Sequence, residues 1–263
     1  MEDNTVTLSS GAVMPLLGFG TWRLQGQAAY DAVRNALDVG YRHFDTAAIY
    51  RNEDQVGRAL RDSEVAREDV FLTTKIPPGE AGRERKLLAT SLAALGVDRL
   101  DLWLIHWPGG AGANLGMWQA LLTAAEDGLT RDVGVSNYSP AQVDELVTQS
   151  GRAPAVNQIR WSPALFDPVR LAHSRDRGVA LEGYSPFRAS DMSHPVLAEV
   201  AAAHGVTPAQ VILRWHLDHR VVVIPKSATP ERIAANFDVF GFRLTDTEMA
   251  RLDSLSGGQR IGR

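Results

Sequence analysis

The chain has 263 residues, of which 44% are hydrophobic and 22% charged, the composition of an ordinary globular protein. Its 27 basic and 31 acidic residues give a net charge of -4 and form no basic block, which argues against nucleic acid or an anionic membrane as partner. Cysteine is absent, which excludes disulfides, thiolate metal sites and cysteine nucleophiles. We expect a small-molecule partner and no metal.

The N-terminus, Met1-Glu2-Asp3-Asn4, lacks the positive-then-apolar order of a signal peptide. No apolar run approaches the length of a membrane span. These features predict a cytoplasmic protein. No exposed apolar helix stripe suggests obligate assembly, so we expect a monomer.

Alternation of apolar and polar residues over 5–14 predicts a small hairpin that turns at Ser10-Gly11. Short β-like runs then alternate with segments of helical period, which favours βα units and a parallel sheet. We predict the α/β class and a (β/α)8 TIM barrel with an N-terminal β-hairpin cap, one domain over 1–263. The expected strands are Leu16–Gly20, His43–Ala47, Asp69–Lys75, Arg99–His106, Asp132–Ser136, Val156–Arg160, Val179–Ser185 and Val221–Pro225.

Helix starts carry clear signals. Capping boxes begin at Ser139, Thr207 and Thr245 and place helices after the fifth and seventh strands and near the C-terminus. Thr229-Pro230 is expected to start another helix in the same way after the eighth strand. Residues 108–114 are too rich in glycine for a helix, so we expect a mobile loop there, beside the pocket.

Four polar residues, Asp45, Tyr50, Lys75 and His106, lie at or just beyond the C-terminal ends of the predicted second, third and fourth strands. In a parallel barrel these strand ends meet on the rim where active sites lie. Tyrosine has an ordinary pKa near ~10, so it donates a proton near neutral pH only if its phenolate is stabilised. We expect Lys75 to do this, Asp45 to hold Lys75 charged, and His106 to fix a substrate oxygen.

Taken singly, each of these residues has an ordinary structural explanation. A lone tyrosine after a strand is commonly a packed amphipathic residue, and a lone lysine at a strand end is commonly a solvated charge. His106, between Ile105 and Trp107, also fits a satisfied core histidine. Their shared place on three consecutive strands favours a proton-transfer site.

A phosphate site is predicted after the eighth strand. Lys226, Ser227 and Thr229 precede a helix that begins at Pro230 and carries Arg232 in its first turn, so backbone N–H groups and two cations converge there. A capped helix with two surface cations is the simpler alternative.

Gly18-Phe19-Gly20 leads into no third glycine, so a Rossmann fingerprint is absent and a dinucleotide would lie on the barrel. Ser136, Asn137 and Gln158 could bind a carboxamide, and Tyr184 could stack on a flat ring.

The chain resembles an aldo-keto reductase over essentially its whole length, most closely the compact bacterial members similar to 2,5-diketo-D-gluconate reductases. The resemblance rests on motifs in family order and spacing. They are Gly18-Phe19-Gly20-Thr21-Trp22, Phe44-Asp45-Thr46-Ala47, Ala48-Ile49-Tyr50, Thr74-Lys75, Ile105-His106-Trp107-Pro108, Gly134-Val135-Ser136-Asn137-Tyr138, Asn157-Gln158, Tyr184-Ser185-Pro186 and Ile224-Pro225-Lys226-Ser227.

The resemblance implies an NADPH-dependent reductase of aldehydes and ketones. Tyr50 would be the general acid, Lys75 and Asp45 its tuning pair, and His106 the residue that orients the carbonyl. Trp22, His106 and Trp107 would contact the substrate. The cofactor, NADPH/NADP+, would be bound by Ser136, Asn137, Gln158, Tyr184, Ser185, Lys226, Ser227, Thr229, Arg232 and Asn236, with Lys226, Ser227 and Arg232 on the adenosine 2′-phosphate.

Two departures from the family pattern bear on affinity and range. Ala235 stands where many relatives have an acidic residue before Asn236-Phe237, which removes an adenine-edge contact. The Gly/Ala-rich segment 109–113 and the short tail suggest an open pocket with a broad range of small carbonyl, dicarbonyl or keto-sugar substrates.

Two other functions stay open: an NADP(H)-binding redox sensor with little turnover, and a lyase or isomerase acting on a sugar phosphate.

Overall fold

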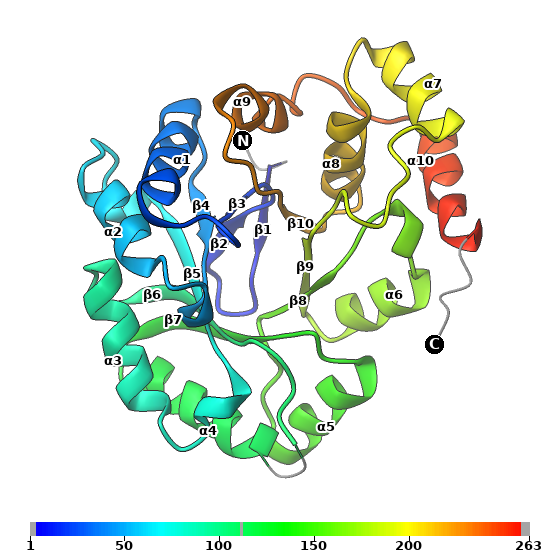
Figure 1. Cartoon of the computed structure of the whole chain (residues 1–263). Coiled ribbons are helices and arrows are strands. Elements are labelled where there is room, and N and C mark those ends of the chain that lie inside the picture. Colours follow the sequence, from blue (N-terminus) through cyan, green and yellow to red (C-terminus); the bar gives the residue numbers. More distant parts are fainter. Residues whose placement is uncertain (1–3, 111–112, 259–263) are drawn as a thin grey trace.

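The computed structural model describes residues 4–110 and 113–258, in which eight parallel strands form a barrel surrounded by helices (Figure 1). Each strand is hydrogen-bonded to the next in chain order. A parallel bridge between Leu17 and Val223 joins the first strand region to the last, so the sheet closes. The predicted barrel is confirmed. Its strands are β3 (Phe19–Gly20), β4 (His43–Asp45), β5 (Phe71–Ile76), β6 (Leu100–Ile105), β7 (Thr130–Ser136), β8 (Val156–Arg160), β9 (Ala180–Tyr184) and β10 (Val222–Ile224).

Most strands differ from their predicted bounds by one to three residues at an end. The largest difference is in the first strand, where only Phe19–Gly20 of the predicted Leu16–Gly20 is regular. Asp69, predicted to begin the third strand, instead ends a short 3₁₀ turn before it. Ends of this kind depend on which backbone groups find partners in neighbouring strands, which a single run of residues does not specify.

The helices pack around the outside of the barrel (Figure 1). The stripes ending at Gly40 and Gly96 form helices as predicted, and both glycines have the positive φ that ends a helix readily. The helices are α1 (Gly26–Val39), α2 (Glu53–Arg61), α3 (Glu84–Leu95), α4 (Ala113–Glu126), α5 (Pro140–Ser150), α6 (Pro168–Asp176), α7 (Pro195–His204), α8 (Pro208–Asp218), α9 (Pro230–Phe237) and α10 (Asp246–Asp253).

All three predicted capping boxes are present, at Ser139, Thr207 and Thr245. The prediction that Thr229 caps α9 in the same way is wrong. Its side chain makes no capping hydrogen bond. Instead, the Thr229 amide donates to Ser227 Oγ at 3.0 Å, which closes a tight turn before the helix.

The glycine-rich segment after β6 is only partly the loop that was predicted, because α4 already begins at Ala113. Asn114 Oδ1 accepts hydrogen bonds from the Gly109 amide at 2.6 Å and from the Tyr138 hydroxyl at 2.9 Å. These bonds tie the two sides of the segment to each other and to the chain after β7. Residues 111 and 112 lie outside the described residues, and with them the prediction of mobility there.

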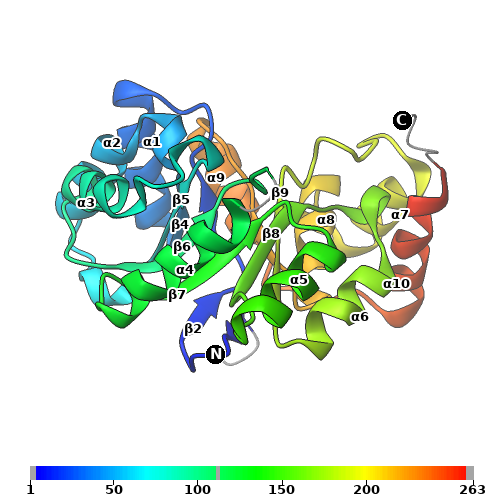
Figure 2. The ribbon, with the colours of Figure 1, turned by 90° about the horizontal axis from the view of Figure 1, so that it is seen from below.

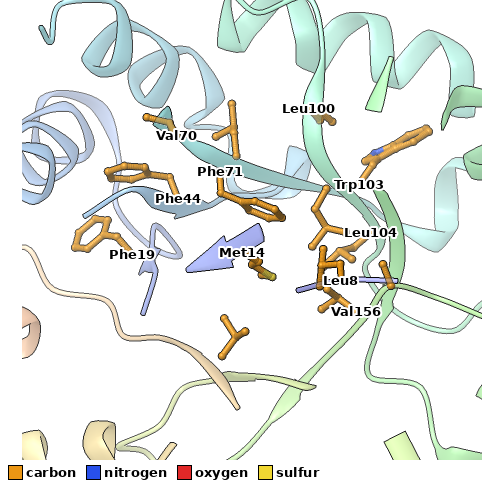
Figure 3. Close-up of a cluster of buried hydrophobic side chains, with 14 of the residues drawn as sticks. Leu8, Met14, Phe19, Phe44, Val70, Phe71, Leu100, Trp103, Leu104 and Val156 are labelled. Carbon is orange, nitrogen blue, oxygen red and sulfur yellow. The ribbon is translucent and has the colours of Figure 1, made fainter. Parts of the chain in front are cut away.

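The N-terminal hairpin closes the amino end of the barrel, as predicted. Its strands are β1 (Thr5–Thr7) and β2 (Val13–Pro15), and Figure 2 shows β2 beyond one end of the barrel strands. Ser10 Oγ donates to Asp132 Oδ2 at 2.8 Å, near the start of β7. Leu8 and Met14 belong to the same buried hydrophobic cluster as strand residues such as Phe19, Phe44 and Leu104 (Figure 3). The opposite, carboxyl end of the barrel is therefore the end left for a ligand.

Within the described ranges, no single helix is long and apolar enough to cross a membrane. The helices α7 and α8, which are bent by 86° at their junction, are long and apolar enough only when they are taken together, and this judgement rests on length and composition alone.

Candidate active site

An ion pair lies inside the carboxyl end of the barrel. Asp45 is the last residue of β4 and Lys75 the penultimate residue of β5, the neighbouring strand. Lys75 Nζ donates to Asp45 Oδ1 at 2.6 Å and to the Thr46 carbonyl oxygen at 2.8 Å. Both side chains are almost fully buried. Since an unpaired buried charge is strongly unfavourable, each residue depends on the other to remain ionised there.

Tyr50 reaches the pair from a single 3₁₀ turn, Ala48–Tyr50, which follows β4. The fully buried amide of Asn52 holds this region, because its Nδ2 donates to the carbonyl oxygens of Thr21 at 3.0 Å and Leu24 at 2.9 Å. Asn52 Oδ1 accepts from the Thr46 hydroxyl at 2.8 Å. One amide therefore ties the chain after β3 to the chain that carries Tyr50.

The four predicted catalytic side chains come together. Lys75 Nζ lies 5.2 Å from the centre of the Tyr50 ring. His106 directly follows β6, and its ring meets that of Tyr50 edge to face, with 5.6 Å between centroids. A phenol, an ammonium, a carboxylate and an imidazole thus share one rim of the barrel.

Burial sets the charge of each group. Burial is the largest single influence on Lys75 and alone would lower its pKa. The charge and hydrogen bond of Asp45, together with Tyr50 and Glu182, outweigh burial and raise that pKa, so the amine stays protonated. Burial lowers the pKa of His106 to about 3, with a further contribution from Lys75, so the imidazole is neutral at pH 7. Burial raises the pKa of Tyr50, and Lys75 offsets only part of this. Lys75 lowers the pKa of the Tyr50 phenol, as we expected, but burial has the larger effect and the pKa is raised overall.

Next to this group lies a network built from the ends of β7, β8 and β9. Asn137 has a positive φ of 65°, which turns its side chain back so that Nδ2 donates to Ser136 Oγ and to the His106 carbonyl oxygen, both at 3.0 Å. Asn137 Oδ1 accepts from the Tyr184 hydroxyl at 2.8 Å. The network fixes the Tyr184 ring by its polar end, and that ring lines the main cavity.

Gln158 lies in the same network but has different partners from those that its predicted role suggests. Its Nε2 donates to Asp45 Oδ2 at 2.7 Å and to Glu182 Oε2 at 3.0 Å. Glu182 is fully buried and was missed at the sequence level. Its position two residues before Tyr184 on one strand was the available signal, because residues i and i+2 of a strand face the same side.

The cavity above these residues has a volume of about 660 Å³. Tyr50, His106, Trp22 and Trp107 line it, so the predicted substrate-contacting residues border one space. Trp22 is 38% exposed and Trp107 is 47% exposed. Ser136, Asn137, Gln158, Tyr184, Ser185 and Lys226 line it as well.

Arg23, Arg160 and Arg188 also line the cavity and were not predicted. The guanidinium carbons of Arg23 and Arg188 lie 4.4 and 5.6 Å from the centre of the Trp22 ring. Asp45 is the one acidic residue among the described lining residues, and it is already paired with Lys75. The mouth of the cavity therefore attracts anions.

The predicted phosphate-binding residues lie after β10, on the same side of the barrel. Lys226, Thr229 and Arg232 are exposed, whereas Ser227 and Asn236 are mostly buried. Lys226 lines the cavity, but Ser227, Thr229, Arg232 and Asn236 are not among its lining residues. The structure thus brings one cation of this group to the cavity and leaves the others on the adjoining surface.

Comparison with known proteins adds a family assignment. The pattern of the Aldo/keto reductase family matches residues 16–256. The morphine 6-dehydrogenase of Pseudomonas putida is 42% identical over 274 residues, covering 98% of this chain and 93% of that protein. The methylglyoxal reductase DkgA of Escherichia coli O157:H7 is 39% identical over 261 residues, covering 98% and 95%. The structure of MGS-M4, an aldo-keto reductase enzyme from a Medee basin deep-sea metagenome library, has a TM-score of 0.94 at 38% identity and covers 98% of this chain and 97% of that one.

Proposed function

The chain belongs to the aldo/keto reductase family and is an oxidoreductase, and from this premise we propose that it reduces aldehydes and ketones with NADPH and with Tyr50 as proton donor. The observation that carries the proposal is the buried Lys75–Asp45 pair, 2.6 Å between charged atoms, held beside the Tyr50 ring. A buried ion pair is costly to build, and a role in the chemistry accounts for its place at the floor of a cavity.

NADPH, when bound, would supply a hydride to the carbonyl carbon. The residues fit such a group, because Tyr184 offers a ring fixed at its hydroxyl end and bordering the cavity, and Lys226 offers an exposed cation at the same cavity. Ser136, Asn137 and Gln158 would hold the carboxamide. Ser185, Ser227, Thr229, Arg232 and Asn236 would complete the site on the adenosine side.

The protein's own groups would handle the proton. Neutral His106 can donate a hydrogen bond to the substrate oxygen and so place that oxygen beside Tyr50. Because its pKa is raised, Tyr50 keeps its proton at neutral pH until negative charge develops on the substrate oxygen. Lys75, held positive by Asp45, then stabilises the phenolate that remains after the proton moves.

The experiment that tests this is NADPH consumption by the purified protein against a small carbonyl panel. The panel contains a dicarbonyl and a bulky ring ketone, because relatives are named for methylglyoxal and morphine, and also an aromatic aldehyde and a keto-sugar acid. Consumption that Tyr50→Phe abolishes would support the proposal. Tight NADPH binding without turnover of any member would favour the redox-sensing alternative, and no NADPH binding would reject both.

We further propose that the chain is one domain and acts as a cytoplasmic monomer. Light scattering on the purified protein checks the assembly, since a mass near twice the chain's 28.6 kDa would reject the monomer. Cell fractionation checks the compartment.

A further inference from the structure

A second carboxyl group lies inside the barrel beside the Lys75–Asp45 pair. Glu182 sits in the middle of β9 and is fully buried. One Glu182 oxygen, Oε2, accepts from Gln158 Nε2 at 3.0 Å. The other, Oε1, has no hydrogen-bond partner among the described residues and lies 3.5 Å from His43 Nε2. The proton-transfer mechanism above makes no use of this residue.

The hydrogen bonds of Gln158 can be counted atom by atom. A glutamine amide has two N–H hydrogens and one oxygen with two lone pairs. Both hydrogens are committed, one to Asp45 Oδ2 at 2.7 Å and one to Glu182 Oε2 at 3.0 Å. The amide oxygen is thus the polar atom left over, on a residue that lines the cavity.

Two acceptors together hold this orientation and satisfy both N–H groups. The two ends of an amide have the same shape, so only their hydrogen-bond partners decide which one faces a ligand. Asp45 alone would satisfy one hydrogen and leave the other without a partner in a dry interior, which is unfavourable. With Glu182 present, the reversed orientation would deprive the N–H₂ group of both acceptors and direct the amide oxygen toward the negative carboxylate of Asp45.

The charge state of Glu182 suits this task. Burial, and then the negative charge of Asp45, raise the pKa of Glu182 to about 8. At neutral pH it is therefore mostly the neutral acid, which still accepts through Oε2 but adds no second negative charge beside Asp45. The balance between Asp45 and Lys75 is left intact.

We propose that Glu182 is a positioning residue for the cofactor amide. By holding the second N–H of Gln158, it keeps the Gln158 oxygen turned to the cavity, where that oxygen accepts a hydrogen bond from the N–H₂ of the nicotinamide carboxamide. The inference rests on the proposed cofactor, and it assigns to Glu182 a role in recognition rather than in proton transfer.

The test compares two oxidised cofactors in equilibrium titrations followed by tryptophan fluorescence. One is NADP+, and the other is its 3-acetylpyridine analogue, in which a methyl group replaces the carboxamide N–H₂. The unmodified protein should bind the analogue roughly 5- to 10-fold more weakly, the size of one hydrogen bond. Glu182→Met removes one of the two acceptors, so it should weaken NADP+ binding, leave the analogue nearly unchanged and lower the ratio of the two dissociation constants toward one.

Glu182→Gln is the matched control, because its amide oxygen can accept the same N–H of Gln158 and should keep the full ratio. Glu182→Leu is a second apolar variant in case the methionine does not fold. Equal weakening of both cofactors in the apolar variants, with the ratio preserved, would mean a merely structural role and would overturn the proposal. A ratio near one in the unmodified protein would overturn the orientation assigned to Gln158. If the unmodified protein bound neither cofactor saturably, the proposed function itself would fail.

Discussion

Two parts of the cavity rim differ in how firmly burial and hydrogen bonds position their side chains before a ligand binds. Asp45, Lys75 and Gln158, on β4, β5 and β8, are buried and joined by hydrogen bonds of 2.6 and 2.7 Å. Lys226 and Arg232, after β10, are exposed, and neither forms an ion pair in the described part of the chain. The difference follows from the work proposed for each part. Groups that act on a reacting atom must be positioned in advance, whereas groups that hold a charged phosphate can be ordered by it.

The sharpest way to break this comparison is to remove the proton donor alone. Tyr50→Phe keeps the ring but loses the hydroxyl, so turnover should fall by about 10²–10⁴-fold, the usual contribution of a general acid. NADPH affinity should change by less than about threefold, because the ring still fills its place. Steady-state kinetics and a fluorescence titration measure the two effects. Turnover near that of the unmodified protein would remove Tyr50 from its role.

The next change tests whether the buried part is preassembled. Lys75→Met leaves the Asp45 carboxylate buried and unpaired, which should cost about 3–5 kcal/mol of unfolding free energy in addition to activity. The double variant Asp45→Asn/Lys75→Met removes both charges and should recover most of the stability but no activity. Urea unfolding of the three proteins measures this. A single variant as stable as the unmodified protein would contradict the buried charge pair.

The exposed part should respond in the opposite way. Lys226→Met and Arg232→Met should each weaken NADPH about tenfold, leave NADH nearly unchanged, and alter the unfolding free energy by less than about 0.5 kcal/mol. Lys86→Met, on exposed α3, is the control and should change neither quantity. Equal losses for NADPH and NADH would place the two cations on a part common to both cofactors and reject the 2′-phosphate assignment.

The two parts also differ in how well the sequence predicts them. Asp45, Tyr50, Lys75 and His106 could be placed on one rim because each follows an apolar run, and strand order in a barrel then brings them together. The hydrogen-bond partners could not be predicted. Gln158 meets Asp45, 113 residues away in the chain, only because their strands close into one barrel, which fixes distances that no local pattern contains. Its other partner, Glu182, lies on the neighbouring strand β9, 24 residues further along the chain.

Short sequence motifs were likewise reliable only where the predicted structure depends on neighbouring residues alone. The capping boxes at Ser139, Thr207 and Thr245 need four consecutive residues, and all three formed. Thr229 also precedes a proline, but Arg232 stands where the three boxes have glutamine or glutamate, and the Thr229 side chain makes no capping hydrogen bond. Strand alternation could have placed Glu182 on the same face as Tyr184, but its hydrogen bond with Gln158 depends on the pairing of β8 and β9.

The smallest expected effect concerns Glu182 and the pH dependence of stability. Its pKa is raised to about 8 in the native protein, whereas the unfolded chain ionises near its ordinary value of 4.5. Between these values the unfolded state releases a proton that the native state keeps, so native stability falls as pH rises, by at most ~1.4 kcal/mol per pH unit.

Glu182→Gln cannot ionise, so its stability relative to the unmodified protein should rise by about 1 kcal/mol between pH 6 and 7. Burial is the chief cause of the low pKa values of His43 and His106, so their effects are common to both proteins and cancel. Urea unfolding at pH 5, 6, 7 and 8 gives the difference, and a constant value would show that Glu182 is already ionised in the native barrel.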